Sequence, residues 1–396
     1  MGQGEATVSL PRARIKVIPE DFVVDEIPAY SPSGQGNHLL LRFEKRDLTT
    51  PDAVRAIGRA LSVPGRDIGI AGLKDKVAVT TQWISLPYPG EPRKISLEEE
   101  LEALELPGIR ILSFARHDNK LRTGHLTWNR FKIRLRGVPA SRVSAVIAGL
   151  ERVAACGLPN AFGAQRFGRD RDNADRALSF LRGESRPPRD ARQRRFLFSA
   201  LQSQVYNRVL EARVADGTWN VPLEGDLLKL ESGGLFLCTD PGEDRARAAR
   251  GELGPTGPIF GVKMREPGGA VLALELRILR ETVGEGFDLA RTKPLGEGTR
   301  RALVLRVSEL EARVVPGGRG PEDGGSGKEG EGDGGATGGA AGGAAEGSAQ
   351  EQPTDLWVEF MLPKGAYATT VLARVVDVEE GTPDENRTPT EAAEDN

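Results

Sequence analysis

The sequence predicts a fold that combines strands and helices in two domains, and three observations support this. The chain has 396 residues, enough for two domains of ordinary size. Its N-terminal part alternates segments of strand character with segments of helical period. Between about residues 216 and 299 the pattern changes to short strands, turns and helices, which indicates a second domain.

The N-terminal part begins with two predicted strands and a helix. The segments at 15–27 and 38–45 have the residue pattern of β-strands. Residues 49–63 follow a helical period and begin with Thr50 and Pro51, which are favoured where a helix starts.

Two further strands, at 67–72 and 77–86, flank the stretch GLKDKVAVTTQ. Asp75 lies in the turn between them, with Lys74 and Lys76 on either side. Taken alone, an acid between two lysines is usually an exposed turn residue with weak ion pairs. Strand-turn-strand junctions also commonly hold functional groups. The residues alone therefore leave both interpretations open.

Three helices are predicted in the middle of the chain from their apolar stripes and end signals. They cover about residues 140–157, 173–182 and 194–215. Two strands near the C-terminus, at 300–307 and 355–363, enclose a Gly-rich segment. We expect that segment to be a long loop joining two strands of one sheet.

Acidic charge is concentrated in two segments that cannot form a packed core. Residues 316–353 hold 15 of the 49 glycines and carry a formal charge of −5, and residues 377–396 carry −7. Such compositions predict a disordered loop and a disordered tail. The whole chain has a formal charge of −3, so the remainder has +9. A basic folded part favours an anionic partner such as nucleic acid.

The residue content argues against several kinds of chemistry. Cys156 and Cys238 are far apart, and His38, His117 and His125 form no recognisable metal or triad motif. No phosphate-binding loop or dinucleotide-binding motif occurs, so we expect neither a metal nor a cofactor. The sequence also has no apolar run of membrane-spanning length and no secretory signal, and we expect a cytoplasmic protein.

Two stretches are rich in basic residues. Residues 116–136 contain seven Lys or Arg and one Asp, and residues 166–195 contain ten Arg and five acids. For any single arginine the simplest interpretation is a solvated helix face. Nearby aromatic residues favour RNA, because rings interleaved with cations suit unstacked bases. These aromatic residues are Phe114, Phe131, Phe162 and Phe167.

Six short motifs occur in one order along the chain. They are IKVIPEDFVVDEI (15–27), GLKDKVAVTTQ (72–82), RHDNKLRTGHLTWNRF (116–131), NAFGAQRFG (160–168), SALQSQVYNRVL (199–210) and MLPKGAYATTVL (361–372). Together they resemble the TruD family of tRNA pseudouridine synthases. The resemblance spans the chain apart from the Gly-rich segment and the acidic tail.

The resemblance implies a reaction and its principal residue. Pseudouridine synthases cleave the N-glycosidic bond of a uridine, rotate the uracil and rejoin it through C5, without a cofactor or metal. The essential aspartate of these enzymes corresponds to Asp75, acting as nucleophile on C1′ or as base at C2′. An aspartate has an unperturbed pKa of about 3.9 and is therefore ionised at cellular pH. By resemblance the substrate is tRNA, at uridine 13 of tRNA-Glu.

Five further residues match substrate-facing positions of the family. Phe162 corresponds to the ring that stacks on the flipped target uracil, and Asn160 to a polar residue that contacts substrate. Phe22 and Tyr367 match further aromatic positions, although strand residues of this kind more often belong to the core. Lys16 matches a basic residue that pairs with the catalytic carboxylate or a phosphate. The resemblance assigns no role to the two lysines beside the catalytic aspartate.

The resemblance also implies an α+β fold. A pseudouridine synthase catalytic domain with a mixed, largely antiparallel sheet would comprise residues 1–186 and 300–376. An inserted α/β TRUD domain would occupy residues 187–299, and residues 377–396 would form the acidic tail. We expect a monomer. Two other functions stay open at this point: an RNA-binding or tRNA-folding protein without catalysis, and a carboxylate-dependent hydrolase that releases a free base from a ribosyl substrate.

Overall fold

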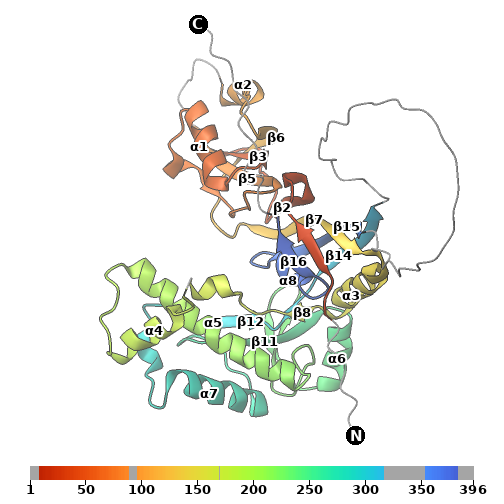
Figure 1. Cartoon of the computed structure of the whole chain (residues 1–396). Helices are drawn as coiled ribbons and strands as arrows, with labels where there is room; N and C mark the ends of the chain where they lie inside the picture. The colour runs from red at the N-terminus through yellow and green to blue at the C-terminus, as the bar shows by residue number, and fades with distance from the viewer. Residues whose placement is uncertain (1–8, 89–95, 169, 316–352, 382–396) are drawn as a thin grey trace, which may run out of the picture. The chain divides into compact units, whose positions relative to one another are not determined.

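The chain forms two compact units, which we call unit 1 and unit 2. Unit 1 comprises Met1–Glu151 and Glu309–Asn396, and unit 2 comprises Arg152–Ser308. The computed structural model describes residues 9–88, 96–168, 170–315 and 353–381 (Figure 1). Most of the predicted Gly-rich loop and most of the acidic tail lie outside the described residues. The domain limits that the family resemblance implies, at 187 and 299, stay predictions.

Unit 1 contains a ten-stranded sheet among its described residues. The main strand order is β14 (Ser308–Val315), β15 (Pro353–Pro363), β7 (Leu126–Pro139), β2 (Phe22–Pro28), β5 (Val79–Pro87), β3 (His38–Arg46) and β6 (Ile109–His117). The remaining three strands are β1 (Arg12–Ile15), β4 (Gly69–Ile70) and β16 (Asp377–Glu380). β2 pairs with β5, and β1 with β16, in parallel. The other described pairs in this sheet are antiparallel, which confirms the predicted mixed, largely antiparallel arrangement.

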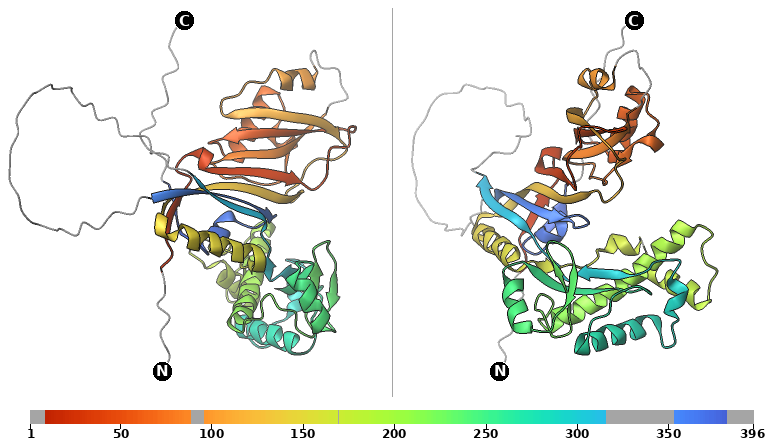
Figure 2. Two further views of the ribbon diagram at one scale, coloured as in Figure 1. Left: turned by 90° about the vertical axis from the view of Figure 1, so that its right-hand side faces the viewer. Right: turned by 180° about the vertical axis from the view of Figure 1, so that it is seen from behind.

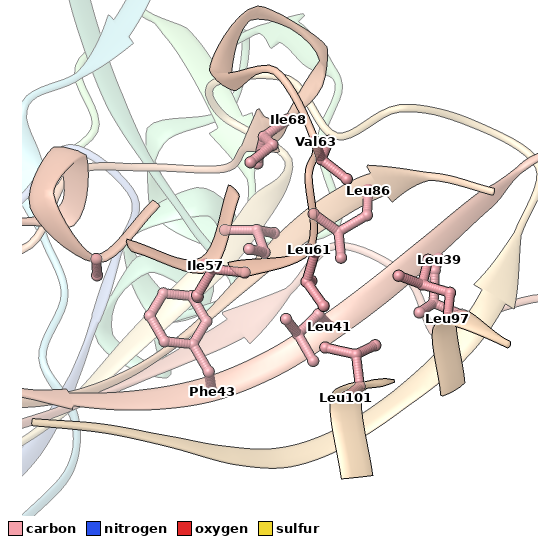
Figure 3. Close-up of a cluster of buried hydrophobic side chains, with 12 residues drawn as sticks. Leu39, Leu41, Phe43, Ile57, Leu61, Val63, Ile68, Leu86, Leu97 and Leu101 are labelled. Atoms are coloured by element: carbon pink, nitrogen blue, oxygen red, sulfur yellow. The ribbon is translucent and has the colours of Figure 1, made fainter. Parts of the chain in front are cut away.

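The core of unit 1 lies between this sheet and two helices, α1 (Thr50–Ala60) and α2 (Leu97–Glu102). Alternate residues of β3 face this core, because side chains along a strand point to opposite faces in turn. Figure 3 shows Phe43 beside Ile57 and Leu41 directed toward Leu61. The helix starts at the predicted Thr50 and Pro51, and the side chain that caps it is Thr49, one residue earlier, which accepts from the Asp52 amide.

The C-terminal segments return to the strands that precede them in unit 1. β15 pairs along its whole length with β7, although more than 200 residues separate them in sequence (Figure 2).

The structure differs from the prediction at the start of the acidic tail. Asp377–Glu380 form β16, which is hydrogen-bonded to β1 and therefore belongs to the folded sheet. Local composition could not indicate this pairing, because its partner strand lies at the other end of the chain.

Unit 2 is built around its longest helix, α5 (Ala191–Ala215), which packs against β11. Its four-stranded sheet has the order β10 (Leu235–Leu237), β9 (Leu227–Leu230), β11 (Leu253–Ile259) and β12 (Thr299–Ala302). A two-stranded ladder joins β8 (Leu158–Pro159) to β13 (Val304–Leu305). Among the described residues, the other α-helices of unit 2 are α4 (Asn173–Arg182), α6 (Pro241–Ala249) and α7 (Gly269–Val283), α8 (Ala368–Leu372) belongs to unit 1, and α3 (Val143–Cys156) begins in unit 1 and ends in unit 2. No described helix is long and apolar enough to cross a membrane.

A buried ion pair joins α7 to β12 in unit 2. The Arg300 guanidinium donates two hydrogen bonds to the Glu275 carboxylate, each 2.7 Å long. Both side chains are shielded from water, with 0% and 5% exposure. Removing one partner of such a pair leaves a buried charge without compensation.

We predict that Glu275→Ala lowers the free energy of unfolding by about 3–5 kcal/mol, measured by urea denaturation. The double variant Glu275→Leu with Arg300→Met should recover most of this loss, because neither charge then remains buried. Glu281→Ala on the same helix is the matched control, since its ion pairs with Arg277 and Arg208 are both exposed and each contributes less than about 1 kcal/mol. Equal losses in the Glu275 and Glu281 variants would contradict the assignment.

Candidate active site

Asp75 lies in the irregular segment between β4 and β5, on unit 1. Its carboxylate side chain is 54% exposed, whereas the strands on either side of the segment are hydrogen-bonded into the sheet. The chain therefore presents this carboxylate to solvent from a rigid support. A reacting group needs this combination of access and fixed position.

The main chain around Asp75 is held by buried side chains. Lys45 Nζ donates to the Asp75 carbonyl oxygen at 2.6 Å. The amide of Lys74 donates to Thr50 Oγ1 at 2.9 Å, and this hydroxyl donates to Gln82 Oε1 at 3.1 Å. Lys45, Thr50 and Gln82 are all at most 1% exposed. These bonds hold the main chain on both sides of the Asp75 α-carbon.

Lys74 points into the protein and not into solvent. Its ammonium lies 2.9 Å from Glu26 Oε2 and also donates to Asn129 Oδ1. The side chains of Lys74 and Glu26 are only 7% and 1% exposed. The simple interpretation of two surface lysines beside an acid is therefore wrong for Lys74. Lys76 is exposed.

Burial makes Lys45 an unusual cation. Desolvation lowers the pKa of its ammonium to about 8, and the nearby positive charge of Lys74 contributes to this lowering. The negative charges of Asp75 and Asp47 act in the opposite direction and raise it. At neutral pH the ammonium is thus mostly charged, and the bond to the Asp75 carbonyl is charge-assisted.

Lys16 brings a second cation to the carboxylate. Its Nζ lies 3.7 Å from Asp75 Oδ1 and 3.0 Å from Glu380 Oε1 of β16. The same ammonium stands 4.7 Å from the centre of the Phe22 ring. Lys16 has a left-handed backbone (φ 56°), which non-glycine residues adopt only where the surrounding structure enforces it. The structure thus brings Lys16, Phe22 and Asp75 together.

The two predicted aromatic residues of unit 1 differ in exposure. Phe22 is 2% exposed and meets Phe131 edge to face, with 6.1 Å between ring centres. The Phe22 ring thus contacts the core and the Lys16 ammonium. Tyr367, at the start of α8, is 55% exposed. Of these two rings, Tyr367 is the one that a ligand can reach directly.

Asn160 and Phe162 lie on unit 2, in the segment that follows β8. The Asn160 amide is bonded at both ends: Nδ2 donates to the Ala302 carbonyl at 2.8 Å, and Oδ1 accepts from Arg301 Nη2 at 2.6 Å. Arg301 in turn places its guanidinium 4.1 Å from the centre of the Phe162 ring. Asn160 therefore orients Arg301 against Phe162.

The Phe162 ring is only partly buried, and its main chain is fixed. Asn207 on α5 accepts from the Phe162 amide at 2.8 Å and donates to its carbonyl at 3.0 Å. Tyr206 packs edge-on against the ring, with 5.3 Å between centres. The ring is thus a rigid platform with a cation stacked on it, an arrangement suited to binding a flat base.

Two supporting residues, Lys45 and Arg301, are not among the predicted site residues. Lys45 follows Leu39, Leu41 and Phe43 at alternate positions of β3, so a lysine on the apolar face of a strand was the available signal. Arg301 lies outside the six motifs. Only its spatial contact with Phe162 reveals it.

The basic strand β7 is largely neutralised. Four of its cations lie opposite carboxylates, so this half of the basic stretch at 116–136 has ordinary structural ion pairs. The pairs are Arg130 with Glu309 (2.7 Å), Lys132 with Glu359 (3.0 Å), Arg134 with Asp355 (2.8 Å) and Arg136 with Asp21 (2.7 Å).

Comparison with known proteins identifies the family. The family model described as tRNA pseudouridine synthase D (TruD) matches residues 11–182 and 190–375. A protein named tRNA pseudouridine synthase D from Anaeromyxobacter dehalogenans (strain 2CP-C) is 41% identical over 388 residues, covering 96% of this chain and 98% of that protein. A protein of that name from Thermus thermophilus is 37% identical over 367 residues, covering 92% of this chain and 89% of that protein.

A solved structure shows the same fold. It is the crystal structure of a putative tRNA pseudouridine synthase D from Methanosarcina mazei, with a TM-score of 0.66, 22% identity, and coverage of 95% of this chain and 96% of that one. The chain is thus an α+β protein of the pseudouridine synthase class, an isomerase class. It belongs to the TruD family of tRNA pseudouridine synthases.

We predict that Lys45→Met loosens the Asp75 segment. Loss of a charge-assisted hydrogen bond should speed amide exchange at residues 74–77 by about 10- to 100-fold, measured by hydrogen-deuterium exchange. The effect should shrink as pH rises through about 8, because the pKa of Lys45 is lowered and the wild-type ammonium then loses its charge. Lys76→Met is the control, since this exposed lysine should not alter exchange. The same exchange in both variants would show that Lys45 does not hold the segment.

Proposed function

We propose that this protein isomerises a uridine of tRNA to pseudouridine through the carboxylate of Asp75. The observation that carries the proposal is the arrangement around this residue: an exposed carboxylate whose main chain is fixed from the interior by Lys45 and Thr50. Lys16 adds a positive charge 3.7 Å from the carboxylate.

The proposed reaction rearranges bonds within one nucleotide. The bond between N1 and C1′ breaks, the uracil turns, and a bond between C5 and C1′ forms. C5 then loses its proton to water, and N1 carries a proton in the product, so no net atom is added. Asp75 would either attack C1′, forming an ester bond that breaks when C5 attaches to C1′, or take a proton from C2′ on a glycal route and return it when C5 attaches. Both roles require an ionised carboxylate within reach of the ribose.

The family resemblance assigns Phe162 to stacking on the flipped uracil, and its surroundings in unit 2 support this role. A target base must leave the RNA stack at a cost of about a few kcal/mol. Stacking on an aromatic ring offsets about 1–3 kcal/mol of such a cost. Asn160 would act through Arg301, which it orients against the ring.

An exposed basic surface on unit 2 supports tRNA as the partner. Near the start of α5, Phe196 is 47% exposed, and several neighbouring arginines are exposed without a side-chain partner among the described residues. These are Arg186, Arg189, Arg192 and Arg195. Unpaired cations around an exposed ring suit RNA. We propose uridine 13 of tRNA-Glu as the target, from the family resemblance.

We further propose that the protein acts as a monomer in the cytoplasm, where tRNA is modified. One chain supplies all of the proposed site residues, namely Asp75, Lys16, Phe22, Tyr367, Asn160 and Phe162.

We predict that Asp75→Asn lowers tritium release from C5-labelled uridine in tRNA by at least about 10²- to 10⁴-fold. The amide has nearly the same shape but carries no charge, so it can act neither as nucleophile nor as base. Asp216→Asn changes an exposed acid at the end of α5 and should retain full activity. An Asp75→Asn protein with wild-type activity would rule out this mechanism.

Chromatography of the reaction products separates the alternatives. Pseudouridine within intact tRNA supports the isomerase, whereas free uracil would identify a ribosyl hydrolase. If the wild-type protein forms neither product from bound tRNA, an RNA-binding protein without catalysis is the better description.

A further inference from the structure

A polar cavity lies in unit 1, at the loop between β6 and β7. Its volume is about 510 Å³. Tyr30, His117, Asn119, Lys120, Arg122 and His125 line it. Two of the three histidines of the chain therefore line one cavity, and His38 lies opposite His117 in the ladder between β3 and β6. The described residues contain no group of His, Cys, Asp or Glu side chains that could hold a metal ion.

The rings of this cavity are arranged to donate hydrogen bonds. His117 Nδ1 accepts from the Ser33 amide at 3.2 Å, so the proton of the neutral ring is on Nε2. Tyr30 stacks on His117 at 4.9 Å, and its hydroxyl lies 2.7 Å from His125 Nδ1. Either tautomer of His125 satisfies this short contact, with the Tyr30 hydroxyl donating to Nδ1 or accepting from it. His117 thus keeps an Nε2–H group that can donate to a ligand.

The other lining residues add positive charge without any acid. Lys120 donates one hydrogen bond to the Arg66 carbonyl at 2.7 Å, and an ammonium has two further donors. Arg122 is exposed, and its side chain has no partner among the described residues. None of the six lining residues is Asp or Glu. The cavity therefore favours a ligand that is anionic and accepts several hydrogen bonds, as a phosphate group does.

The loop that carries these donors is tied to the Asp75 segment. The Gly124 amide donates to the Ala71 carbonyl at 2.8 Å, and the Leu121 amide donates to Ser85 Oγ at 2.9 Å. A β-carbon on Gly69 would lie 2.4 Å from the Leu121 carbonyl oxygen, so this close contact requires glycine. Ala71 precedes Asp75 by four residues, which can span at most about 14 Å. The loop is consequently both rigid and close to the proposed reaction centre.

We propose that this cavity binds a phosphodiester group of the RNA strand near the target uridine. The proposal rests on the proposed function and names one contact by which unit 1 would hold the substrate. The strand β7 supplies no competing site, because its cations are paired with carboxylates. The loop cations Lys120 and Arg122 are the ones that line the cavity.

The test is the salt dependence of binding between the full-length protein and an unmodified tRNA transcript, measured by fluorescence anisotropy. Arg122→Gln should weaken binding about tenfold at low salt. It should also reduce the slope of log affinity against log salt by about 0.7–0.9, the value for one phosphate contact. Arg122→Lys keeps the positive charge, so its slope of log affinity against log salt should equal that of the wild type. Arg59→Gln is the matched control, because Arg59 on α1 is also exposed and has no side-chain partner among the described residues.

Identical affinity and slope for Arg122→Gln and Arg59→Gln would overturn the proposal. So would an Arg122→Gln protein that loses affinity for inorganic phosphate but binds the transcript as the control does, since the cavity would then take a free anion. The binding readout does not need catalysis. A protein that forms no pseudouridine but shows the Arg122 effect would reject the proposed isomerase and keep the phosphate site.

Discussion

The hydrogen bond from the buried Lys45 ammonium to the Asp75 carbonyl is the interaction on which the proposed site depends. Placing a lysine on the apolar face of a strand opposes folding, since desolvation disfavours the charged form and lowers its pKa to about 8. The bond is short, at 2.6 Å, and lies under an exposed carboxylate. The free-energy cost of burying the Lys45 ammonium thus falls at a position where this ammonium fixes a reactive group. Strained or desolvated groups are common at functional sites.

The other contacts around Asp75 extend this arrangement. Lys74 is anchored in the sheet through Glu26, and Lys16 approaches the carboxylate from the segment between β1 and β2. Three lysines therefore act on one short segment in three ways: one on the main chain, one as an anchor and one on the carboxylate. Several motifs of the sequence meet at this point because strands far apart in the chain pair side by side. The motifs at 15–27, 72–82 and 116–131 supply Glu26, Gln82 and Asn129.

Much of this could be predicted from the sequence, because local patterns dictate local structure. Alternation identified β3, and the Thr50–Pro51 pattern marked the start of α1. Contacts between distant segments could not be predicted. The partners of the β7 cations depend on the pairing of β7 with β15. The ordering of Asp377–Glu380 depends on β1, and the role of Arg301 depends on the return of β12 to the segment that holds Phe162. From the sequence, the basic stretch that includes β7 favoured RNA only through its aromatic neighbours, and residues 377–380 were assigned to the acidic tail.

The spatial grouping of the three histidines is another feature that the local sequence does not reveal. In sequence they form no motif, whereas in the fold two line one cavity and the third, His38, lies opposite one of them in the ladder between β3 and β6.

The central claim, that Asp75 on its fixed segment converts a tRNA uridine, can be tested in cells. Pseudouridine mapping of tRNA should be compared between cells lacking this protein and the same cells supplied with wild-type or Asp75→Asn protein. We expect one tRNA pseudouridine that disappears without the protein and returns only with the wild type. A map that is unchanged by loss of the protein, or restored equally by both proteins, would contradict the claim.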